Sequence, residues 1–241
     1  MKVNLTCIML VMGESSNEDI RKNTIKNVSL LVKQTNHALP SVVANIDQDI
    51  KVQIRNELIK GLGTDRFHLE QVYALGDKKY FDSNAIDIIH LGVTNAVNVN
   101  NIASDYDLIS VSIEKNTIKI GNKVYSYKTK EKASFSIEYT FETNAKTATE
   151  DKFLIELLTA WKYMRTRLEY SDILFKFLPL EFTLEDVRQV YMLLSERQVD
   201  KSNFHKKIMK YCTEIPGKLS CRGYRPSKHY KFNLKFGDLW Q

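Results

Sequence analysis

The chain has 241 residues, of which 43% are hydrophobic and 27% charged, and a formal net charge of +6 at pH 7, which is typical of a globular protein with one large or two modest domains. No apolar run reaches the roughly 18 residues that a membrane-spanning helix needs, and the run Cys7–Met12 lacks the length and the cleavage site of a signal peptide. The three cysteines, Cys7, Cys212 and Cys221, form no CxxC pair and have no histidine cluster beside them, so we expect reduced thiols in a cytoplasmic protein and no metal site.

Most of the first 150 residues are predicted to form strands, because short runs of apolar and β-branched residues alternate with turn residues. The second strand follows the first closely enough to be its hairpin partner. The expected strands are Val3–Met12, Asn27–Lys33, His68–Leu75, Ala85–Val93, Tyr106–Glu114, Thr117–Ile120 and Lys123–Lys128. Residues 134–141 are assigned neither to a strand nor to a helix.

Two helices are expected among these strands and directly after them. The first is capped by Asp47 and runs to about Lys60, where Gly61 or Gly63 ends it, and it carries isoleucine or leucine every four residues. The second runs from Glu150 to about Arg167 and has one apolar side. That side consists of Leu154, Leu157, Leu158, Trp161, Met164 and Leu168.

The C-terminal region begins with a pair of predicted helices. Thr183 and Asp186 have the spacing of a capping box, and Leu184, Val187 and Leu194 follow at helical intervals. A polar break at residues 196–200 separates this helix from a second one, which starts at Asp200 or at Ser202.

The second helix of the pair has two chemically different sides. The apolar side consists of Phe204, Ile208, Tyr211 and Cys212. Asn203, Lys206, Lys207 and Lys210 lie opposite, within an arc of about 100°. Pro216-Gly217 is expected to end the unit. Two short runs, Lys218–Arg222 and His229–Phe232, then form a hairpin joined by residues 223–227. Helix, turn, cationic helix and basic hairpin is the order of a winged helix-turn-helix domain.

The positive charge of the chain is concentrated in this region. Residues 201–235 contain ten lysines and arginines but one acid, Glu214, whereas residues 1–150 contain 18 basic and 18 acidic residues. This asymmetry is typical of a surface that binds phosphates. A lysine-rich solvated surface is the alternative interpretation, and the helix register together with the hairpin favours nucleic acid.

Four short segments of the C-terminal region resemble a known family. They are Leu168-Glu169-Tyr170-Ser171, residues 178–184 (LPLEFTL), residues 200–204 (DKSNF), and Arg225-Pro226-Ser227 with Tyr230 and Phe232. These segments resemble the C-terminal domain of the Nudix-related transcriptional regulators, bacterial repressors in which a Nudix-like domain precedes a winged helix. The resemblance implies an α+β fold. Residues 1–149 would form a Nudix-like α/β/α sandwich that senses a ligand, and residues 150–241 a linker helix and the winged helix-turn-helix domain.

The Nudix box of this family, Gx5Ex7REUxEExGU with U a large aliphatic residue, follows a Leu-Pro pair. Its glutamates share one helix and bind Mg²⁺, which needs several oxygen ligands. The alignment rests on Leu39-Pro40 and on Asn56-Glu57-Leu58. Three positions of the box match: Glu57, Leu58 and Gly63. At the others, Val42 replaces the first Gly, Gln48 replaces the first Glu, and Asn56 replaces the Arg. Lys60 and Gly61 replace the Glu pair. One carboxylate beside an ammonium group does not hold Mg²⁺, so we expect no hydrolysis.

The resemblance implies a small-molecule effector such as ADP-ribose, a related nucleotide or a sugar, and no cofactor. The residues expected at the ligand site are Gln48, Asn56, Glu57, Lys60 and Asp77. The alternative is an active Mg²⁺-dependent hydrolase of ADP-ribose or a nucleoside diphosphate sugar, with Asp47, Asp49 and Glu57 as metal ligands. His90, in a strand, is interpreted as a structural residue rather than as a catalytic base.

For the DNA interface, we expect Asn203 and Lys206 to contact base edges in the major groove. The other residues of the set would contact the DNA backbone or the minor groove. The whole set is Lys201, Asn203, Lys206, Lys207, Lys210, Arg222, Tyr224, Arg225, Lys228 and Lys231. A homodimer on a palindromic operator is expected, because a single winged helix gives limited specificity. A protein-interaction scaffold with a solvated basic tail remains a further alternative.

Overall fold

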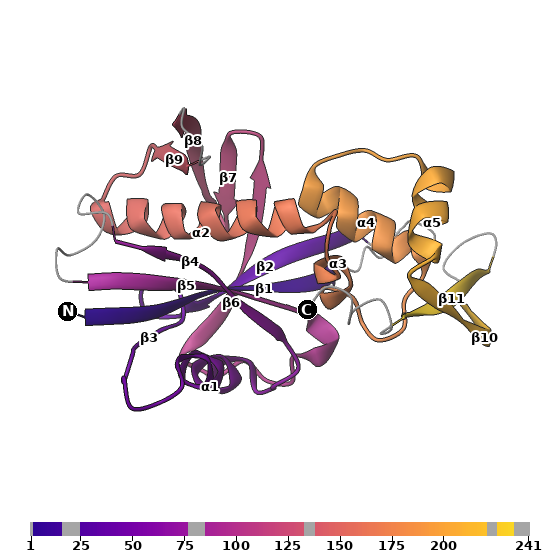
Figure 1. Ribbon diagram of the computed structural model, residues 1–241, viewed down its shortest axis with the longest axis horizontal. Coiled ribbons are helices and arrows are strands. Elements are labelled where there is room, and N and C mark those ends of the chain that lie inside the picture. The colour runs from indigo at the N-terminus through magenta and orange to yellow at the C-terminus, as the bar shows by residue number, and fades with distance from the viewer. Residues whose placement is uncertain (1, 16–24, 77–84, 133–137, 221–225, 234–241) are drawn as a thin grey trace.

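The structure, a computed structural model, describes residues 2–15, 25–76, 85–132, 138–220 and 226–233 (Figure 1). Its N-terminal part is one mixed sheet. The strands are β1 (Lys2–Ser15), β2 (Ile25–Lys33), β3 (Ser41–Val43), β4 (His68–Leu75), β5 (Ala85–Asn95), β6 (Tyr106–Glu114), β7 (Thr117–Ile120), β8 (Lys123–Lys132) and β9 (Glu138–Thr143). Their order is β4-β5-β1-β2-β6-β7-β8-β9, with β3 also paired to β1. β1 and β5 are parallel, and the other pairs are antiparallel.

All seven predicted strands are present, and β1 and β2 form the expected antiparallel pair, with Leu10 opposite Leu30. Two further strands were not predicted. β3 has three residues, which is too short to show an alternating pattern. β9 occupies part of the stretch that sequence reasoning left unassigned, and it pairs with β8.

Helices α1 (Ile50–Leu62) and α2 (Ala148–Arg167) cover opposite faces of the sheet (Figure 1). The alternation of side chains along β1 produces the two layers. One set of β1 side chains packs in the cluster that contains α1: Leu5, Cys7, Met9 and Val11. The other set packs in the cluster that contains α2: Ile8, Leu10 and Met12. The predicted α/β/α sandwich is therefore confirmed.

The boundaries of α1 differ slightly from the prediction. Asp49, not Asp47, is the N-cap, because its carboxylate accepts hydrogen bonds from the backbone N–H groups of Lys51 and Val52 at 2.7 and 3.2 Å. The helix ends at Gly63, where the backbone is left-handed, with φ of 64°. A Cβ atom at this position would lie 2.7 Å from the backbone oxygen of Asn101, so glycine is required by both φ and space.

The C-terminal part contains the helices α3 (Ile173–Lys176), α4 (Leu184–Ser195) and α5 (Lys201–Met209) and the strands β10 (Cys212–Ser220) and β11 (Ser227–Phe232). The predicted capping box at Thr183 and Asp186 is present, and Asp200 caps α5. The short helix α3 was not predicted. The winged helix-turn-helix order is confirmed. None of the helices in the described ranges has both the length and the apolar character needed to cross a bilayer.

Two local predictions for this part were wrong. α5 ends at Met209, so Tyr211 and Cys212 do not belong to its apolar side, and Cys212 instead begins β10. Pro216-Gly217 does not end the unit but lies inside β10, where the pairing with β11 shifts register between Glu214 and Leu219. A bulge of this kind tolerates proline, because no ladder hydrogen bond is required there.

The two parts of the molecule are joined by several contacts. Lys26 of β2 forms a 3.2 Å ion pair with Asp186 at the start of α4, and their side chains are only 4% and 15% exposed. Glu196, just after α4, accepts a hydrogen bond of 2.9 Å from the backbone N–H of Lys115. The buried amide of Asn95 donates to the carbonyl of Leu178 at 2.8 Å. One hydrophobic cluster also continues from β1 and β5 through α2 into α4, α5 and β11. The domain boundary predicted between residues 149 and 150 remains a prediction.

Candidate functional site

α5 presents one side to solvent and the other to the core. Phe204 and Ile208 are buried, and the ring of Phe204 packs 5.1 Å from the ring of Tyr191 on α4. The opposite side is exposed along its whole length. Its polar residues include Asn203, Lys206, Lys207 and, just after the helix, Lys210. The fifth predicted DNA-contacting residue of this segment, Lys201, is also exposed but lies in the first turn beside Glu185 of α4.

The first turn of α5 is fixed to α4 through Glu185. Arg188 donates to this carboxylate at 2.7 to 3.2 Å, and Lys201 lies 3.3 Å from it. His205 lies 3.7 Å from the same carboxylate. Burial lowers the pKa of His205 and outweighs the effect of Glu185, so at pH 7 the imidazole adds no positive charge to the helix.

The wing consists of β10 and β11 and is attached at its base to the start of α4. The backbones of Phe182 and Tyr230 exchange two hydrogen bonds, of 3.0 and 2.8 Å. Two wing lysines of the predicted set lie near acids: Lys228 pairs with Glu214 at 2.9 Å, and Lys231 lies 3.7 Å from Glu181. These pairs are more than 30% exposed and therefore weak, so both lysines remain accessible to phosphates. Arg222, Tyr224 and Arg225 of the predicted set lie outside the described residues.

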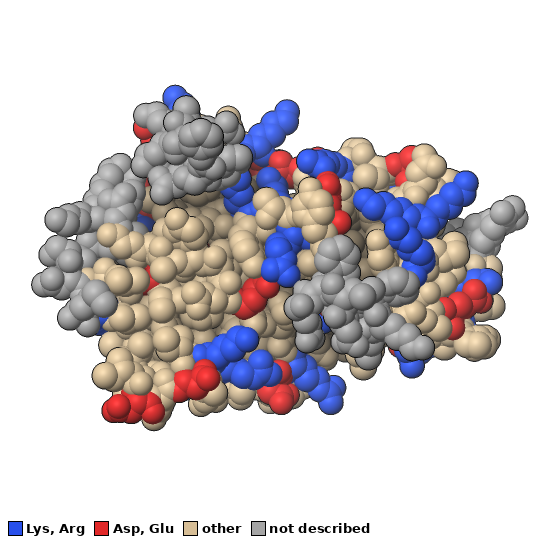
Figure 2. Space-filling model, viewed as in Figure 1, with Lys and Arg blue, Asp and Glu red and all other residues tan. Residues whose placement is uncertain are grey.

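Figure 2 shows lysine and arginine side chains gathered over the part of the molecule that contains α4 and α5. This surface carries part of the positive charge of the C-terminal region. Because a duplex carries one negative charge per about 1.7 Å of its axis, an exposed row of lysines on one helix is suited to bind it.

Of the predicted ligand residues, Asn56, Glu57 and Lys60 lie within about one turn of α1. Gln48 precedes the helix and Asn56 is exposed. Glu57 accepts a hydrogen bond of 2.5 Å from the hydroxyl of Tyr106 and lies 3.3 Å from Lys33. Lys60 pairs with Asp105 at 3.2 Å. Asp77 lies outside the described residues. Their assignment to a ligand remains a prediction.

The carboxylates required by the hydrolase alternative are separated. Asp49 caps the start of α1, and Glu57 lies eight residues further along, which corresponds to about 12 Å of helix. Oxygen ligands of Mg²⁺ must all lie about 2 Å from the ion, so these two carboxylates do not share one ion in this arrangement. Within the described residues there is no group of three histidine, cysteine or acidic side chains placed to hold a metal.

A cavity of about 600 Å³ lies on the other face of the sheet, beneath the N-terminal half of α2. We call it the sandwich cavity. Its apolar lining includes Leu39, Ile109, Ile120, Tyr125 and Phe153, and neither Gln48, Asn56, Glu57 nor Lys60 belongs to the lining. Such a volume is typical of small-molecule sites.

A cluster of buried charges lies beside the sandwich cavity. Asp87 of β5 is fully buried, forms an ion pair with Lys152 of α2 and accepts a hydrogen bond of 2.5 Å from Asn4. Glu156 lines the cavity and lies 3.8 Å from Lys152. Burial, together with the negative charge of Asp87, raises the pKa of Glu156 to about 8 despite Lys152. Sequence reasoning missed these residues, although a lone aspartate inside the apolar run of β5 was a usable signal.

His90 lies in β5 as a buried side chain, 1% exposed. Burial lowers its pKa, so the imidazole is neutral at pH 7. It faces the α1 side of the sheet, as its register partner Cys7 does.

Taken together, a Nudix-like α/β/α sandwich precedes a winged helix that carries an exposed cationic helix. Comparison with known proteins agrees with this combination of folds. Residues 174–232 match the family described as the NrtR DNA-binding winged helix domain. This segment of the chain is therefore similar to the NrtR winged helix, and the resemblance to the Nudix-related transcriptional regulators is confirmed.

Solved structures share the whole fold. A MutT/nudix family protein from Enterococcus faecalis superimposes with a TM-score of 0.65 at 14% identity, over 96% of this chain and 87% of that chain. NrtR of Shewanella oneidensis gives a TM-score of 0.63 at 12% identity. The same protein in complex with a 27mer DNA gives 0.62 at 12% identity, and in both cases 98% of this chain and 95% of that chain are covered. No curated protein sequence matches the chain.

Proposed function

We propose that the protein is a ligand-responsive transcriptional regulator, acting in the cytoplasm as a repressor, that binds operator DNA through α5 and the wing. The observation that carries the proposal is the exposed lysine side of α5 within a segment that matches the NrtR winged helix domain. Asn203 and Lys206 would contact base edges, because amide and ammonium groups match acceptors in the major groove. The remaining lysines would contact phosphates.

A homodimer on a palindromic operator is part of this proposal. The half-sites of such an operator would lie about one helical turn of DNA, or a multiple of it, apart. The size of the surface supports this: one α5 and one wing contact a short segment of DNA, and a two-fold dimer doubles the length of DNA contacted.

The salt dependence of DNA binding tests the proposal. For the full-length protein and a duplex taken from upstream of its own gene, we expect log Kobs to fall linearly with log [KCl], with a slope of about −5. The reason is that about six cations would replace condensed counterions at phosphates, each contributing about −0.9. Fluorescence anisotropy over a series of KCl concentrations measures this slope. A slope near zero would contradict the proposed interface.

The sandwich is proposed to sense its effector without hydrolysing it, and ADP-ribose, a related nucleotide or a sugar is the proposed effector class. The sandwich cavity supports this part by its volume and by a lining that combines apolar and charged side chains. The engagement of Glu57 by Lys33 and Tyr106 supports the loss of metal chemistry.

Accordingly, ADP-ribose is expected to bind, with heat detectable by isothermal titration calorimetry, and to remain intact in the presence of Mg²⁺. Liquid chromatography of the same samples after prolonged incubation reports any AMP and ribose 5-phosphate formed. Glu57→Gln serves as the control, because a true hydrolase would lose turnover in this variant. Turnover that depends on Mg²⁺ and on Glu57 would establish the hydrolase alternative.

A further inference from the structure

The charged side chains that line the sandwich cavity lie in pairs of opposite sign. The ammonium group of Lys123 lies 3.3 Å from the carboxylate of Glu150, and both residues belong to the lining. Lys152, also in the lining, forms an ion pair with the fully buried Asp87. With histidine counted as neutral, Glu156 is the remaining charged residue among the described residues that line the cavity. Each lysine at this cavity therefore already has an acidic partner.

Glu156 adds little negative charge to the cavity at pH 7. Its side chain is 5% exposed, and burial together with the negative charge of Asp87 raises the pKa of Glu156 to about 8 despite Lys152. The carboxyl group is therefore mostly protonated at pH 7, and it donates a hydrogen bond to the carboxylate of Asp87. The charges around the cavity then cancel, because Asp87 balances Lys152 and Glu150 balances Lys123.

This arrangement disfavours a charged group inside the cavity. A phosphate that approached Lys123 would also approach the carboxylate of Glu150, which repels it. A phosphate that drew Lys152 away would take the ion-pair partner from the fully buried Asp87, which is costly. A cationic ligand would find the carboxylates of Glu150 and Asp87 already paired. Because an unpaired ion beside an apolar lining also loses its hydration, the cavity is suited to an uncharged group.

The uncharged part of the lining combines polar and aromatic side chains. The hydroxyl groups of Ser41 and Thr149 and the amide of Asn122 line the cavity, and none of the three makes a side-chain hydrogen bond to another described residue. The aromatic rings of Tyr125 and Phe153 belong to the same lining. A sugar ring presents C–H groups that pack on aromatic rings and hydroxyl groups that form hydrogen bonds with uncharged polar side chains. The lining is therefore complementary to a hydroxylated ring.

We propose that the sandwich cavity binds an uncharged ring with several hydroxyl groups, either a monosaccharide or a nucleoside, and excludes phosphate. The ring packs on Tyr125 and Phe153, and its hydroxyl groups form hydrogen bonds with Ser41, Asn122 and Thr149. This inference rests on the proposed function, because the same cavity is the effector site there, and it narrows the chemistry of that site. In ADP-ribose, the two ends are uncharged hydroxylated rings. One of these ends therefore enters the cavity, and the diphosphate stays outside.

D-Ribose, ribose 5-phosphate, adenosine and AMP are the probes for calorimetry on the full-length protein at pH 7. We expect ribose or adenosine to bind, and which of them binds more tightly distinguishes a monosaccharide site from a nucleoside site. The phosphate ester of each is expected to bind no more tightly than its parent. The proposal is overturned by wild-type protein that binds neither ribose nor adenosine at millimolar concentration. It is also overturned if a phosphate ester binds more than about threefold more tightly than its parent.

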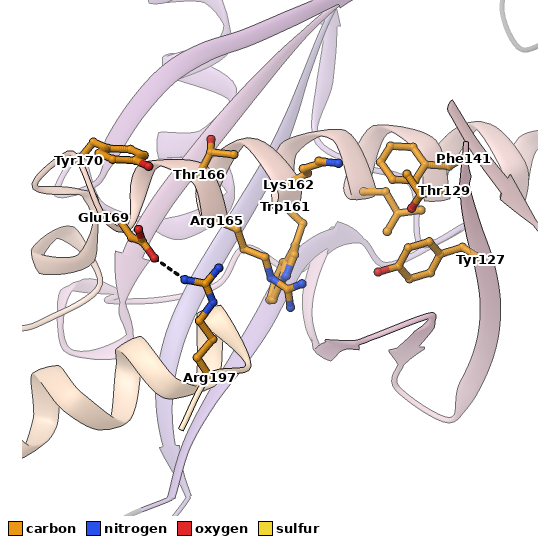
Figure 3. Close-up of a pocket in the computed structure, with 11 residues that line it drawn as sticks. Tyr127, Thr129, Phe141, Trp161, Lys162, Arg165, Thr166, Glu169, Tyr170 and Arg197 are labelled. Carbon is orange, nitrogen blue, oxygen red and sulfur yellow. Dashed lines mark hydrogen bonds and ion pairs between the residues drawn. The ribbon is translucent and has the colours of Figure 1, made fainter. Parts of the chain in front are cut away.

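A matched pair of variants on α2 locates the binding. Thr149 is exposed and lines the sandwich cavity, so Thr149→Trp places a bulky ring there without changing charge and is expected to weaken binding about tenfold or more. Thr166 is also exposed on α2 but lines a second cavity, of about 370 Å³, which Figure 3 shows. Thr166→Trp is therefore expected to leave the affinity unchanged. Equal affinities of the two variants would overturn the assignment to the sandwich cavity.

Glu150→Gln tests the exclusion of phosphate. The substitution removes the acid beside Lys123, so the affinity for ribose 5-phosphate relative to ribose is expected to rise about threefold or more. An unchanged ratio would show that this pair does not exclude phosphate and would overturn that part of the proposal. ADP-ribose that binds Thr149→Trp as tightly as the wild type would overturn the cavity assignment and leave the proposed regulator standing. DNA affinity without ligand, measured on the same samples, reports on the proposed function separately.

Discussion

Replacing Lys206 and Lys210 together with alanine is expected to weaken operator binding by about 2–4 kcal/mol, or about 30- to 1000-fold. Lys206 would lose a base-edge contact and Lys210 a phosphate contact. The helix itself should persist, because both side chains are exposed, Phe204 and Ile208 still bury the other side, and alanine is a good helix former. Fluorescence anisotropy against the operator duplex measures the change.

The salt dependence gives a second readout of the same variant. The slope of log Kobs against log [KCl] should become shallower by about 1, because Lys210 would displace a counterion at a phosphate whereas Lys206 would contact a base edge. Lys51→Ala/Lys119→Ala has the same change in net charge and should keep the wild-type slope and affinity. Equal affinities for the wild type and Lys206→Ala/Lys210→Ala would show that α5 does not contact DNA.

The second large effect is expected for Lys26→Met, which should lower the free energy of unfolding by about 3–5 kcal/mol. Lys26 is 4% exposed and pairs with Asp186 at 3.2 Å. The substitution removes the ammonium group that lies 3.2 Å from the largely buried Asp186 carboxylate. Urea denaturation followed by circular dichroism measures the loss.

The pH dependence of this effect has a defined sign. Burial acts to raise the pKa of Asp186, but the charge of Lys26 and the hydrogen bonds from Thr183 lower it overall below its ordinary value of 3.8. Stabilisation by the pair is therefore present at neutral pH and is lost as pH falls through the lowered pKa. The deficit of Lys26→Met should shrink in acid, when Asp186 becomes protonated.

Lys26→Met/Asp186→Asn is the control for the buried charge. It removes the carboxylate charge but keeps an oxygen that accepts the capping hydrogen bonds of Thr183. Much of the lost stability should return. A double variant as unstable as Lys26→Met alone would mean that the loss comes from packing rather than from the buried charge.

Regular elements of the fold were predictable where one periodicity runs over several turns or residues. The alternating strands and the apolar sides of α2 and α4 are examples. The cap of α4 at Thr183 was read from local hydrogen-bonding residues, and Asp200, the cap of α5, was one of the two candidates that the sequence offered. Short elements were not predictable. β3 is held by pairing with β1, and β10 passes through Pro216-Gly217 because a bulge and pairing with β11 outweigh local turn preference.

The candidate sites show the same division. The lysine side of α5 follows from spacing alone, since burial of Phe204 determines which residues face outward. The cavities cannot be predicted from residue spacing, because they depend on residues brought together by tertiary structure. Asp87 and Lys152 are 65 positions apart in the chain and form an ion pair only because α2 packs on β5. Arg165 likewise meets Glu196 only after α4 docks against α2.

The unbroken hydrophobic cluster between the sheet and the winged helix has a consequence for how a signal travels. A domain attached only by a flexible linker would rotate freely and unfold in a separate transition. Ligand binding would then change its orientation by large rotations. Here the two halves share buried side chains, so heat should melt them in a single cooperative transition. Ligand binding must then change operator affinity through helix shifts of a few tenths of an ångström to about 2 Å, with the helices still packed.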